Sequence, residues 1–151
     1  MKTVMVFGTF DGVHPGHEYF FAEAKKLGDR LVVCIARDTI VEALKGRRPK
    51  RPEIERREAL AESRSVDQVV YGDRELGSYR IVEEISPEVI ALGYDQQELK
   101  DDLARWLNAK GKSIELVSIA AHHPELYKSS IVNKAAGDRP GRPSFRRRSG
   151  R

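Results

Sequence analysis

The sequence contains very little cysteine, the residue that stabilises small secreted proteins through disulfides and zinc-dependent proteins through thiolate ligands. One cysteine, Cys34, stands among its 151 residues, so the chain cannot form an internal disulfide or a zinc site built from several thiolates. No run approaches the 18 or so apolar residues of a membrane span, and the stretch from Met1 to Phe7 has a strand pattern without the features of a signal peptide. We therefore expect a soluble, cytoplasmic protein with no membrane partner, in which Cys34 is a buried structural thiol.

The positive charge of the chain is concentrated at one end. The net charge is +4, but residues 137–151 hold six arginines against one aspartate and account for +5, which leaves −1 for the first 136 residues. This segment is rich in proline and glycine, and it cannot bury enough apolar surface to order itself. We predict a folded domain over residues 1–136 and a disordered basic tail over 137–151, and we expect nucleic acid to bind, if at all, only through the tail.

Before the tail, short apolar segments of β-branched residues alternate with segments of helical period. The pattern predicts strands at 3–7, 31–36, 68–71, 89–92 and 114–118, and helices at 15–27, 39–44, 53–63, 79–85, 97–110 and 129–136. Such alternation is typical of one Rossmann-like α/β domain, here with a five-stranded, mainly parallel sheet and helices on both faces. Gly28 and Gly111 follow two of the helices, where left-handed C-caps are expected.

The segment from Gly8 to His17 follows the first predicted strand and reads Gly-Thr-Phe-Asp-Gly-Val-His-Pro-Gly-His. Its glycines are four residues apart, which does not match the G-x-G-x-x-G of a dinucleotide-binding fold. The later Gly111-Lys112-Ser113 lacks the upstream glycine of a P-loop, because position 106 is tryptophan. Hydride transfer and P-loop hydrolysis are therefore both disfavoured.

His14 and His17 place two imidazoles three residues apart at the start of a predicted helix, on one face of it. The free N–H groups and the dipole of a helix N-terminus favour an anion, and imidazole donates hydrogen bonds near neutral pH. This combination predicts a phosphate site. Two alternatives remain open: ordinary surface histidines, or a metal site completed by Asp11, His122 or His123.

The order of these residues resembles the signature of the cytidylyltransferase-like nucleotidyltransferase superfamily. In that superfamily His-x-Gly-His, here His14 to His17, follows the first strand of a Rossmann-like, HUP-type sheet. Further stretches resemble archaeal-type FAD synthases, which adenylylate FMN: Ala36–Asp38, Lys45–Pro49, Glu55–Arg57, Val66–Asp67 and Gly93–Gln96. The last helix departs from the pattern, because Ile131 stands where a third hydroxyl residue is expected after Ser129 and Ser130.

The resemblance implies an enzyme that transfers AMP from ATP to FMN and releases FAD and pyrophosphate. ATP and FMN would be its partners, Mg²⁺ or another divalent cation would accompany the ATP, and a homodimer is compatible with the sequence. The alternative enzyme is a CTP-dependent cytidylyltransferase acting on glycerol 3-phosphate or a similar phosphorylated molecule. The alternative from another class is a nucleotide- or RNA-binding module that performs no chemistry.

Nucleotidyl transfer needs donors and positive charge around an α-phosphorus that gains negative charge in the transition state. The resemblance assigns this catalytic role to His14, His17 and Lys45. The implied nucleotide-binding residues are Gly8, Thr9, Phe10, His14, Gly16, His17, Gly93, Tyr94, Asp95, Gln96, Ser129 and Ser130. A third group, which would contact the acceptor or has no settled role, comprises Asp11, Arg56, Arg57, His122 and Tyr127. Among these, Asp11 is the candidate ligand for Mg²⁺.

Overall fold

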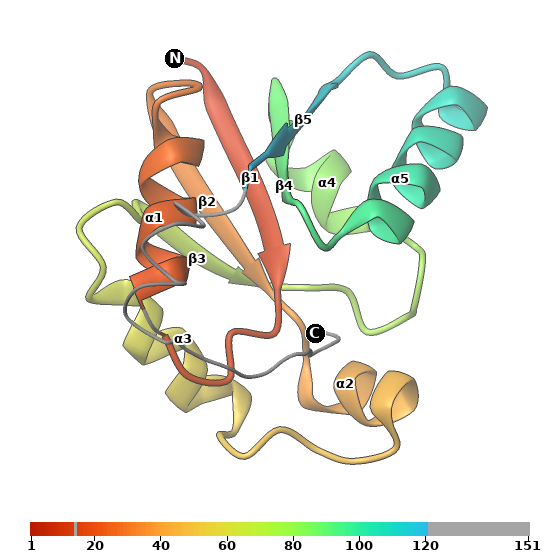
Figure 1. The fold of residues 1–151 in the computed structure, drawn as a ribbon. Coiled ribbons are helices and arrows are strands. Elements are labelled where there is room, and N and C mark those ends of the chain that lie inside the picture. The colour runs from red at the N-terminus through yellow and green to blue at the C-terminus, as the bar shows by residue number, and fades with distance from the viewer. Residues whose placement is uncertain (14, 121–151) are drawn as a thin grey trace.

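The computed structural model describes residues 1–13 and 15–120. Its centre is a five-stranded sheet in the order β3-β2-β1-β4-β5, and every pairing in it is parallel (Figure 1). The strands are β1 (Thr3–Gly8), β2 (Arg30–Ile35), β3 (Gln68–Tyr71), β4 (Val89–Gly93) and β5 (Glu115–Ile119). The predicted Rossmann-like α/β architecture is confirmed.

Five helices connect these strands, and each described element lies within two residues of its predicted bounds. They are α1 (Pro15–Lys25), α2 (Asp38–Lys45), α3 (Glu53–Ala61), α4 (Arg80–Ile85) and α5 (Gln97–Lys110). Helices α1 and α3 cover one face of the sheet, α4 and α5 cover the other, and α2 lies beyond its carboxyl edge (Figure 1). None of the described helices is long and apolar enough to cross a membrane. The helix predicted at 129–136 and the tail lie outside the described residues.

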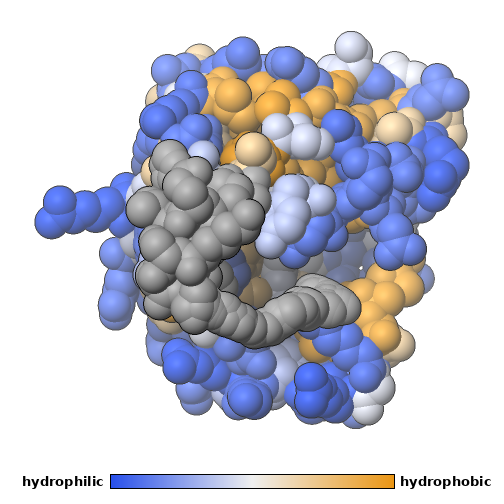
Figure 2. Space-filling model, viewed as in Figure 1, coloured by the Kyte–Doolittle hydropathy of each residue, from blue (hydrophilic) through white to orange (hydrophobic). Residues whose placement is uncertain are grey.

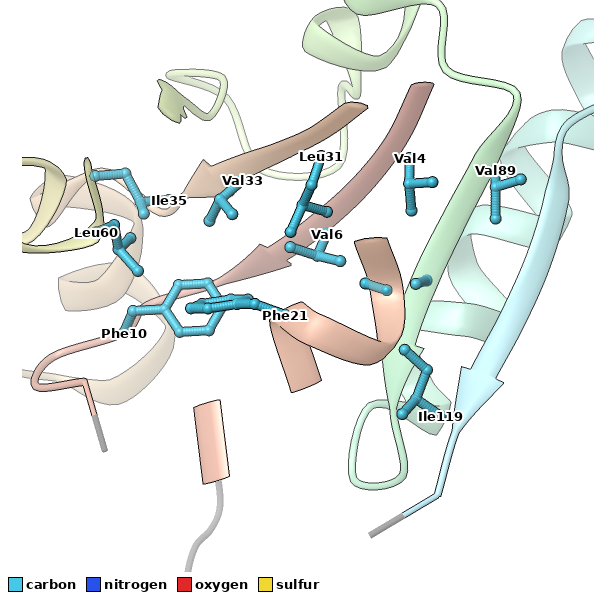
Figure 3. Packing of buried hydrophobic residues seen from close by; sticks show 12 residues of the cluster. Val4, Val6, Phe10, Phe21, Leu31, Val33, Ile35, Leu60, Val89 and Ile119 are labelled. Atoms are coloured by element: carbon cyan, nitrogen blue, oxygen red, sulfur yellow. The ribbon is translucent and has the colours of Figure 1, made fainter. Parts of the chain in front are cut away.

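The side chains of the central strand, β1, point alternately to the two faces of the sheet and contribute to a separate core on each face. Successive side chains of a strand point to opposite faces, so Val4 and Val6 pack with Phe21 of α1 (Figure 3). Met5, between them, joins Leu103 of α5 on the other face. All five of these side chains are fully buried. The cores therefore fix both helical layers on the sheet and leave its carboxyl edge for the loops.

Cys34 is buried within β2, which confirms the prediction of a structural thiol. Burial raises the pKa of this thiol to about 12, with the nearby Asp73 carboxylate acting in the same direction. The thiolate, which is the reactive form of cysteine, is therefore disfavoured at neutral pH.

The two glycines that follow α1 and α5, Gly28 and Gly111, are needed for different reasons. Gly111 has φ +66° and caps α5 in the left-handed conformation, as predicted. The same prediction for Gly28 is wrong, because Gly28 is not among the residues with positive φ. A Cβ atom there would lie 2.8 Å from the Lys2 carbonyl oxygen and 2.8 Å from Val4 Cγ2. Glycine is needed at this position because the turn after α1 passes directly against β1.

Candidate active site

The candidate site lies at the carboxyl edge of the sheet, where β1 and β4 separate. Within the described chain these strands pair at Val4–Val89 and Met5–Ile90 and then diverge. We call the region between their carboxyl ends, Gly8 and Gly93, the crevice, and the two strands its walls. The helix after β1 covers one face of the sheet and the helix after β4 covers the other, which is the switch-point arrangement where open α/β sheets bind ligands. Figure 2 shows that the described side chains on this face of the molecule are mostly hydrophilic.

Gln96 joins the two walls of this crevice. Its side-chain oxygen accepts a hydrogen bond from Gly93 N (2.8 Å), and its side-chain nitrogen donates to Phe7 O (2.9 Å). The amide thus replaces a rung of the sheet at the point where β1 and β4 no longer pair. The sequence predicts that Gln96 contacts the nucleotide, and that role stays a prediction. The role that the structure gives it is to fix the spacing of the walls.

The other members of the Gly93–Gln96 stretch lie beside this bridge. Tyr94 is 71% exposed, and its aromatic ring is therefore accessible for stacking against a base or a flavin. Asp95 lies close to the backbone of Gly93, because a Cβ atom on that glycine would be 3.0 Å from Asp95 Oδ1. A glycine at position 93 therefore lets the loop fold back so that Asp95 lies against the end of β4.

His17 follows Gly16 in the first turn of α1 and is held by two phenylalanines. Its ring meets Phe10 edge-on with ring centroids 5.2 Å apart, and it stacks with Phe21 at a centroid separation of 6.4 Å. Phe10 and Phe21 also contact each other, at 5.2 Å, and belong to the core beneath the loop (Figure 3). The packed core on this face therefore sets the orientation of the predicted catalytic imidazole.

The loop between β1 and α1 has an unusual backbone. Phe10 adopts φ +52°, in the left-handed region that non-glycine residues seldom occupy. Its ring folds back over Gly8, where a Cβ atom would lie only 2.6 Å from the ring. Gly12 has φ +125°, which a side chain would strain. Gly8 and Gly12 are therefore required by the shape of the loop itself, in addition to the predicted approach of a phosphate.

Arg56 is fully buried beneath this loop, with 0% exposure. Its guanidinium donates to four protein oxygens: Arg51 O (3.0 Å), Thr9 O (2.9 Å), Ala36 O (2.8 Å) and Asp38 Oδ1 (2.7 Å). The sequence predicts that Arg56 reaches the acceptor or the triphosphate, whereas the structure engages it with the loops around the site. The signal in the sequence is its spacing from Leu60, since residues four apart share a helix face and Leu60 is buried.

Asp38 is not among the predicted site residues, and it is the anionic partner of Arg56. Burial opposes ionisation of its carboxyl, but hydrogen bonds from Arg56 and the Glu53 backbone, together with the charges of Arg56 and Arg48, hold its pKa below the ordinary value. Asp38 and Glu53 also cap each other's helices: Asp38 N donates to Glu53 Oε1 (2.7 Å), and Glu53 N donates to Asp38 Oδ2 (3.2 Å). The starts of α2 and α3 are thereby tied together.

Asp11 binds the segment that joins α2 to α3, residues 46–52, which we call the connecting arm. Its two carboxylate oxygens accept hydrogen bonds from Lys50 N (2.7 Å) and Arg51 N (2.9 Å). Lys45 is the last residue of α2, exposed, and is followed by Gly46 with φ +79° as the helix cap. Asp11 therefore links the loop after β1 to the arm that follows Lys45.

Of the remaining predicted residues, one is described at the end of β3 and five lie outside the described chain. Arg57 lies with its guanidinium carbon 5.8 Å from the centre of the Tyr71 ring, and Arg37 lies at 5.1 Å from the same ring. These contacts have cation–π geometry and place Arg57 at the end of β3. The residues outside are His14, Ser129, Ser130, His122 and Tyr127, so the pairing of His14 with His17 stays a prediction.

A hollow of about 400 Å³ lies between the α1 and α3 side chains beside the loop. It is lined by Gly12, Val13, Glu18, Arg51, Ala59, Glu62 and Ser63. Two carboxylates face one guanidinium in this lining, and Ser63 Oγ donates to Glu18 Oε1 (2.7 Å). This balance of charge does not favour a triphosphate.

Comparison with known proteins identifies the family. Residues 5–135 match the Cytidylyltransferase-like family model. A protein named FAD synthase from Thermococcus sibiricus is 41% identical over 129 residues, which cover 85% of this chain and 84% of the relative. A second FAD synthase, from Ferroglobus placidus, is 44% identical over 121 residues, which cover 80% of this chain and 78% of that relative.

Solved structures agree with this assignment. The crystal structure of a lipopolysaccharide core biosynthesis protein from Thermoplasma volcanium superposes with a TM-score of 0.75 at 35% identity, covering 81% of this chain and 98% of that one. A pantothenate synthetase from Thermus thermophilus shares the fold, with a TM-score of 0.59 at 16% identity over 83% of this chain and 58% of that one. The chain belongs to the cytidylyltransferase-like family of nucleotidyltransferases, and the relatives that match most of its length are named FAD synthases.

Proposed function

We propose that the protein is an FAD synthase, which transfers AMP from ATP to FMN and releases pyrophosphate. The observation that carries the proposal is the crevice between β1 and β4, where Gln96 bridges Gly93 and Phe7 and where Phe7 leads directly into the loop whose Phe10 contacts His17. It is found in a chain about 40% identical to proteins named FAD synthase. The adenine nucleotide would bind in this crevice, with its phosphates at the loop and its base toward Tyr94.

The reaction is a displacement at the α-phosphorus of ATP. A phosphate oxygen of FMN forms a bond to this phosphorus, and the bond from the phosphorus to the oxygen bridging to the β-phosphate breaks, so that pyrophosphate leaves. Catalysis of such a step consists of positioning and of stabilising the negative charge that develops on the α-phosphoryl oxygens. His17 would donate a hydrogen bond to these oxygens, and Lys45 would supply a positive charge to the departing pyrophosphate.

A divalent cation fits this site as a companion of the triphosphate. Among residues 1–13 and 15–120, no group of three or more histidine, cysteine, aspartate or glutamate side chains is arranged to hold a metal. Asp11 already accepts from two backbone amides. When bound, Mg²⁺ would neutralise charge on the phosphates. We therefore propose that it is held mainly by phosphate oxygens and that Asp11 acts through the connecting arm.

The test is an incubation of the purified protein with ATP or CTP and each of three acceptors: FMN, glycerol 3-phosphate and phosphopantetheine. We expect pyrophosphate release with ATP and FMN together, and much less with any other pair. Release that requires CTP and glycerol 3-phosphate would replace the proposal with the cytidylyltransferase alternative. No release with any pair, together with nucleotide binding, would indicate a module that performs no chemistry. The His17→Ala variant is the control for contaminating activity.

A further inference from the structure

We propose that Arg56 is a positioning residue for nucleotidyl transfer: by holding the Thr9 carbonyl, it directs the Phe10 N–H toward the phosphate site. The proposal rests on the function proposed above. It starts from an observation that this function does not need, which is a fully buried arginine whose guanidinium donates to four protein oxygens.

Stability alone is a poor explanation for such a residue. Removing a guanidinium and a carboxylate from water costs free energy that their attraction often fails to recover, and apolar residues of similar size commonly stabilise a fold as well or better. What Arg56 offers is a rigid, planar set of donors that fixes several acceptors in defined directions. Here three of the four acceptors are backbone carbonyls of segments that meet at the carboxyl edge of the sheet: the loop after β1, the loop after β2 and the connecting arm. The fourth is the side chain of Asp38, at the start of α2.

The contact with Thr9 has a direct consequence for the next residue. In a trans peptide the carbonyl and the N–H point in opposite directions, and the structure has no cis peptide bond among its described residues. Because Thr9 O points inward to Arg56 NH1 at 2.9 Å, the N–H of Phe10 points outward, away from the guanidinium. A rotated peptide would instead turn the carbonyl oxygen outward, where it would repel a phosphate.

The backbone at Phe10 makes this restraint necessary. A non-glycine residue at φ +52° is held in a sparsely populated conformation, which persists only when its surroundings determine it several times over. Arg56 fixes the peptide before Phe10, and the packing of the Phe10 ring against His17 and Phe21 fixes its side chain. One buried cation thus orients two expected phosphate donors, the Phe10 amide directly and the His17 ring through Phe10.

The variant that tests this is Arg56→Lys, which keeps the positive charge but loses the branched set of donors. We expect kcat for FAD formation to fall by about 10- to 100-fold, the scale of a small misplacement of catalytic groups, with a smaller change in KM for ATP or FMN. Leu107→Ala, in α5 on the other face of the sheet, is the control for a general loss of packing. It should lower the unfolding midpoint and leave kcat of the folded protein near the parental value.

A second readout does not depend on turnover. In the parent, the amide resonance of Phe10 in a ¹H–¹⁵N spectrum should shift on addition of α,β-methylene-ATP, and in Arg56→Lys this shift should be lost or strongly reduced. If Arg56→Lys does not fold, Asp38→Asn decides, because it removes the negative charge that pairs with the guanidinium, and a fall in kcat is again expected.

Three results would overturn the proposal: parental kcat in a folded Arg56→Lys, or in Asp38→Asn where that variant decides; a loss of kcat no larger than in Leu107→Ala; or an unchanged Phe10 shift. If the parent itself forms no FAD, the proposed function fails, and the Phe10 measurement still reports on Arg56.

Discussion

On the α1 and α3 side of the sheet, the core ends in Phe10, whose ring meets His17 at 5.2 Å. On the α4 and α5 side, the core ends in Tyr79, which packs edge-on against Trp106 at 5.5 Å and donates its hydroxyl to Asp102 Oδ2 at 2.5 Å. Burial, reinforced by Asp102, raises the pKa of Tyr79 above its ordinary value, so this hydroxyl remains a donor. The first core therefore ends in a side chain that contacts the predicted catalytic His17. The second core ends in a hydrogen bond between two side chains, Tyr79 and Asp102, that have no predicted role in the site.

This difference indicates that packing on both faces of the sheet contributes to stability, whereas packing on only one face also contributes to catalysis. Side chains of similar size are equally buried on both faces, such as Phe21 and Leu103, each at 0% exposure. A loss of packing on either face should therefore cost similar stability. Only a loss on the α1 and α3 side should also disturb catalysis, because only that packing orients His17. The following predictions test this separation.

The largest effect is expected for His17→Ala. Removing one donor to charge that develops in the transition state typically lowers kcat by about 100- to 1,000-fold, and the fold should remain intact because the ring is only half buried. Steady-state kinetics of FAD formation, with a thermal unfolding curve as the control, measure both quantities. An unchanged kcat with a raised KM would show that His17 binds the ground state and the transition state equally.

Phe10→Ala and Leu103→Ala form a matched pair across the sheet. Each should lower the free energy of unfolding by about 2–5 kcal/mol, as large-to-small changes in a core do. Only Phe10→Ala should also lower kcat, by about 10- to 100-fold, because His17 then loses its edge-on contact with the Phe10 ring. Denaturant unfolding and kinetics at a temperature where both variants are folded provide the comparison. Equal kcat values in the two variants would remove the distinction between the faces.

The Asp11→Asn variant distinguishes between two roles for Asp11, an anchor of the connecting arm and a ligand of Mg²⁺. Asparagine retains one acceptor oxygen for two backbone amides, so we expect KM for ATP to rise about fivefold, equivalent to about 1 kcal/mol for one weakened hydrogen bond. Amide hydrogen exchange at Lys50 and Arg51 should become faster. The Mg²⁺ concentration for half-maximal activity should stay at the parental value, and a marked increase would instead make Asp11 a metal ligand.

Acid stability should reveal a smaller contribution from Asp67. The hydrogen bond from Lys25, against the opposing effect of burial, and the bond from Leu31 N hold its pKa below the ordinary value. A lowered folded pKa gives stability that is present above the unfolded value of about 3.9 and is lost as the pH falls through the folded pKa. The unfolding midpoint of Asp67→Asn should therefore fall less between pH 5 and pH 3 than that of the parent. Asp101→Asn, an exposed change on α5, is the control.

The smallest effect is expected for removal of residues 138–151. Exposed arginines attract anions over about 8 Å at physiological ionic strength, and the site has its own donors. We predict that truncation leaves kcat nearly unchanged and causes at most a small, salt-sensitive loss of ATP affinity. A fall in kcat of tenfold or more at 0.15 M salt, about 1.4 kcal/mol, would make the tail part of the active site.

Sequence periodicity predicted the described strands and helices because each layer of this fold repeats a simple apolar pattern. The sequence also predicts a site directly after β1, from the glycine and histidine motif there, and that assignment stays a prediction. The contacts that shape the site could not be predicted in this way. Asp11 accepts from the amides of Lys50 and Arg51, about 40 positions away, and such a pairing depends on the path of the connecting arm.

Neighbouring residues of the same type illustrate the same limit. Arg56 is buried among the loops, and Arg57 is exposed and lies against Tyr71. Only the helical phase relative to Leu60 distinguishes the two in the sequence. Gln96 likewise has the chemistry of a base-reading residue, and its contacts with Phe7 and Gly93 emerge only when two distant strands lie side by side.

The most direct test of AMP transfer is the fate of the phosphates of ATP. The protein is incubated with FMN and ATP that carries ³²P at either the α or the γ position, and the products are separated. We predict that the α label enters FAD and that the γ label appears in pyrophosphate, both at rates that His17→Ala lowers by about 100-fold or more. Alpha label that remains in free AMP, or γ label that appears in FMN or in inorganic phosphate, would contradict nucleotidyl transfer as the activity of this chain.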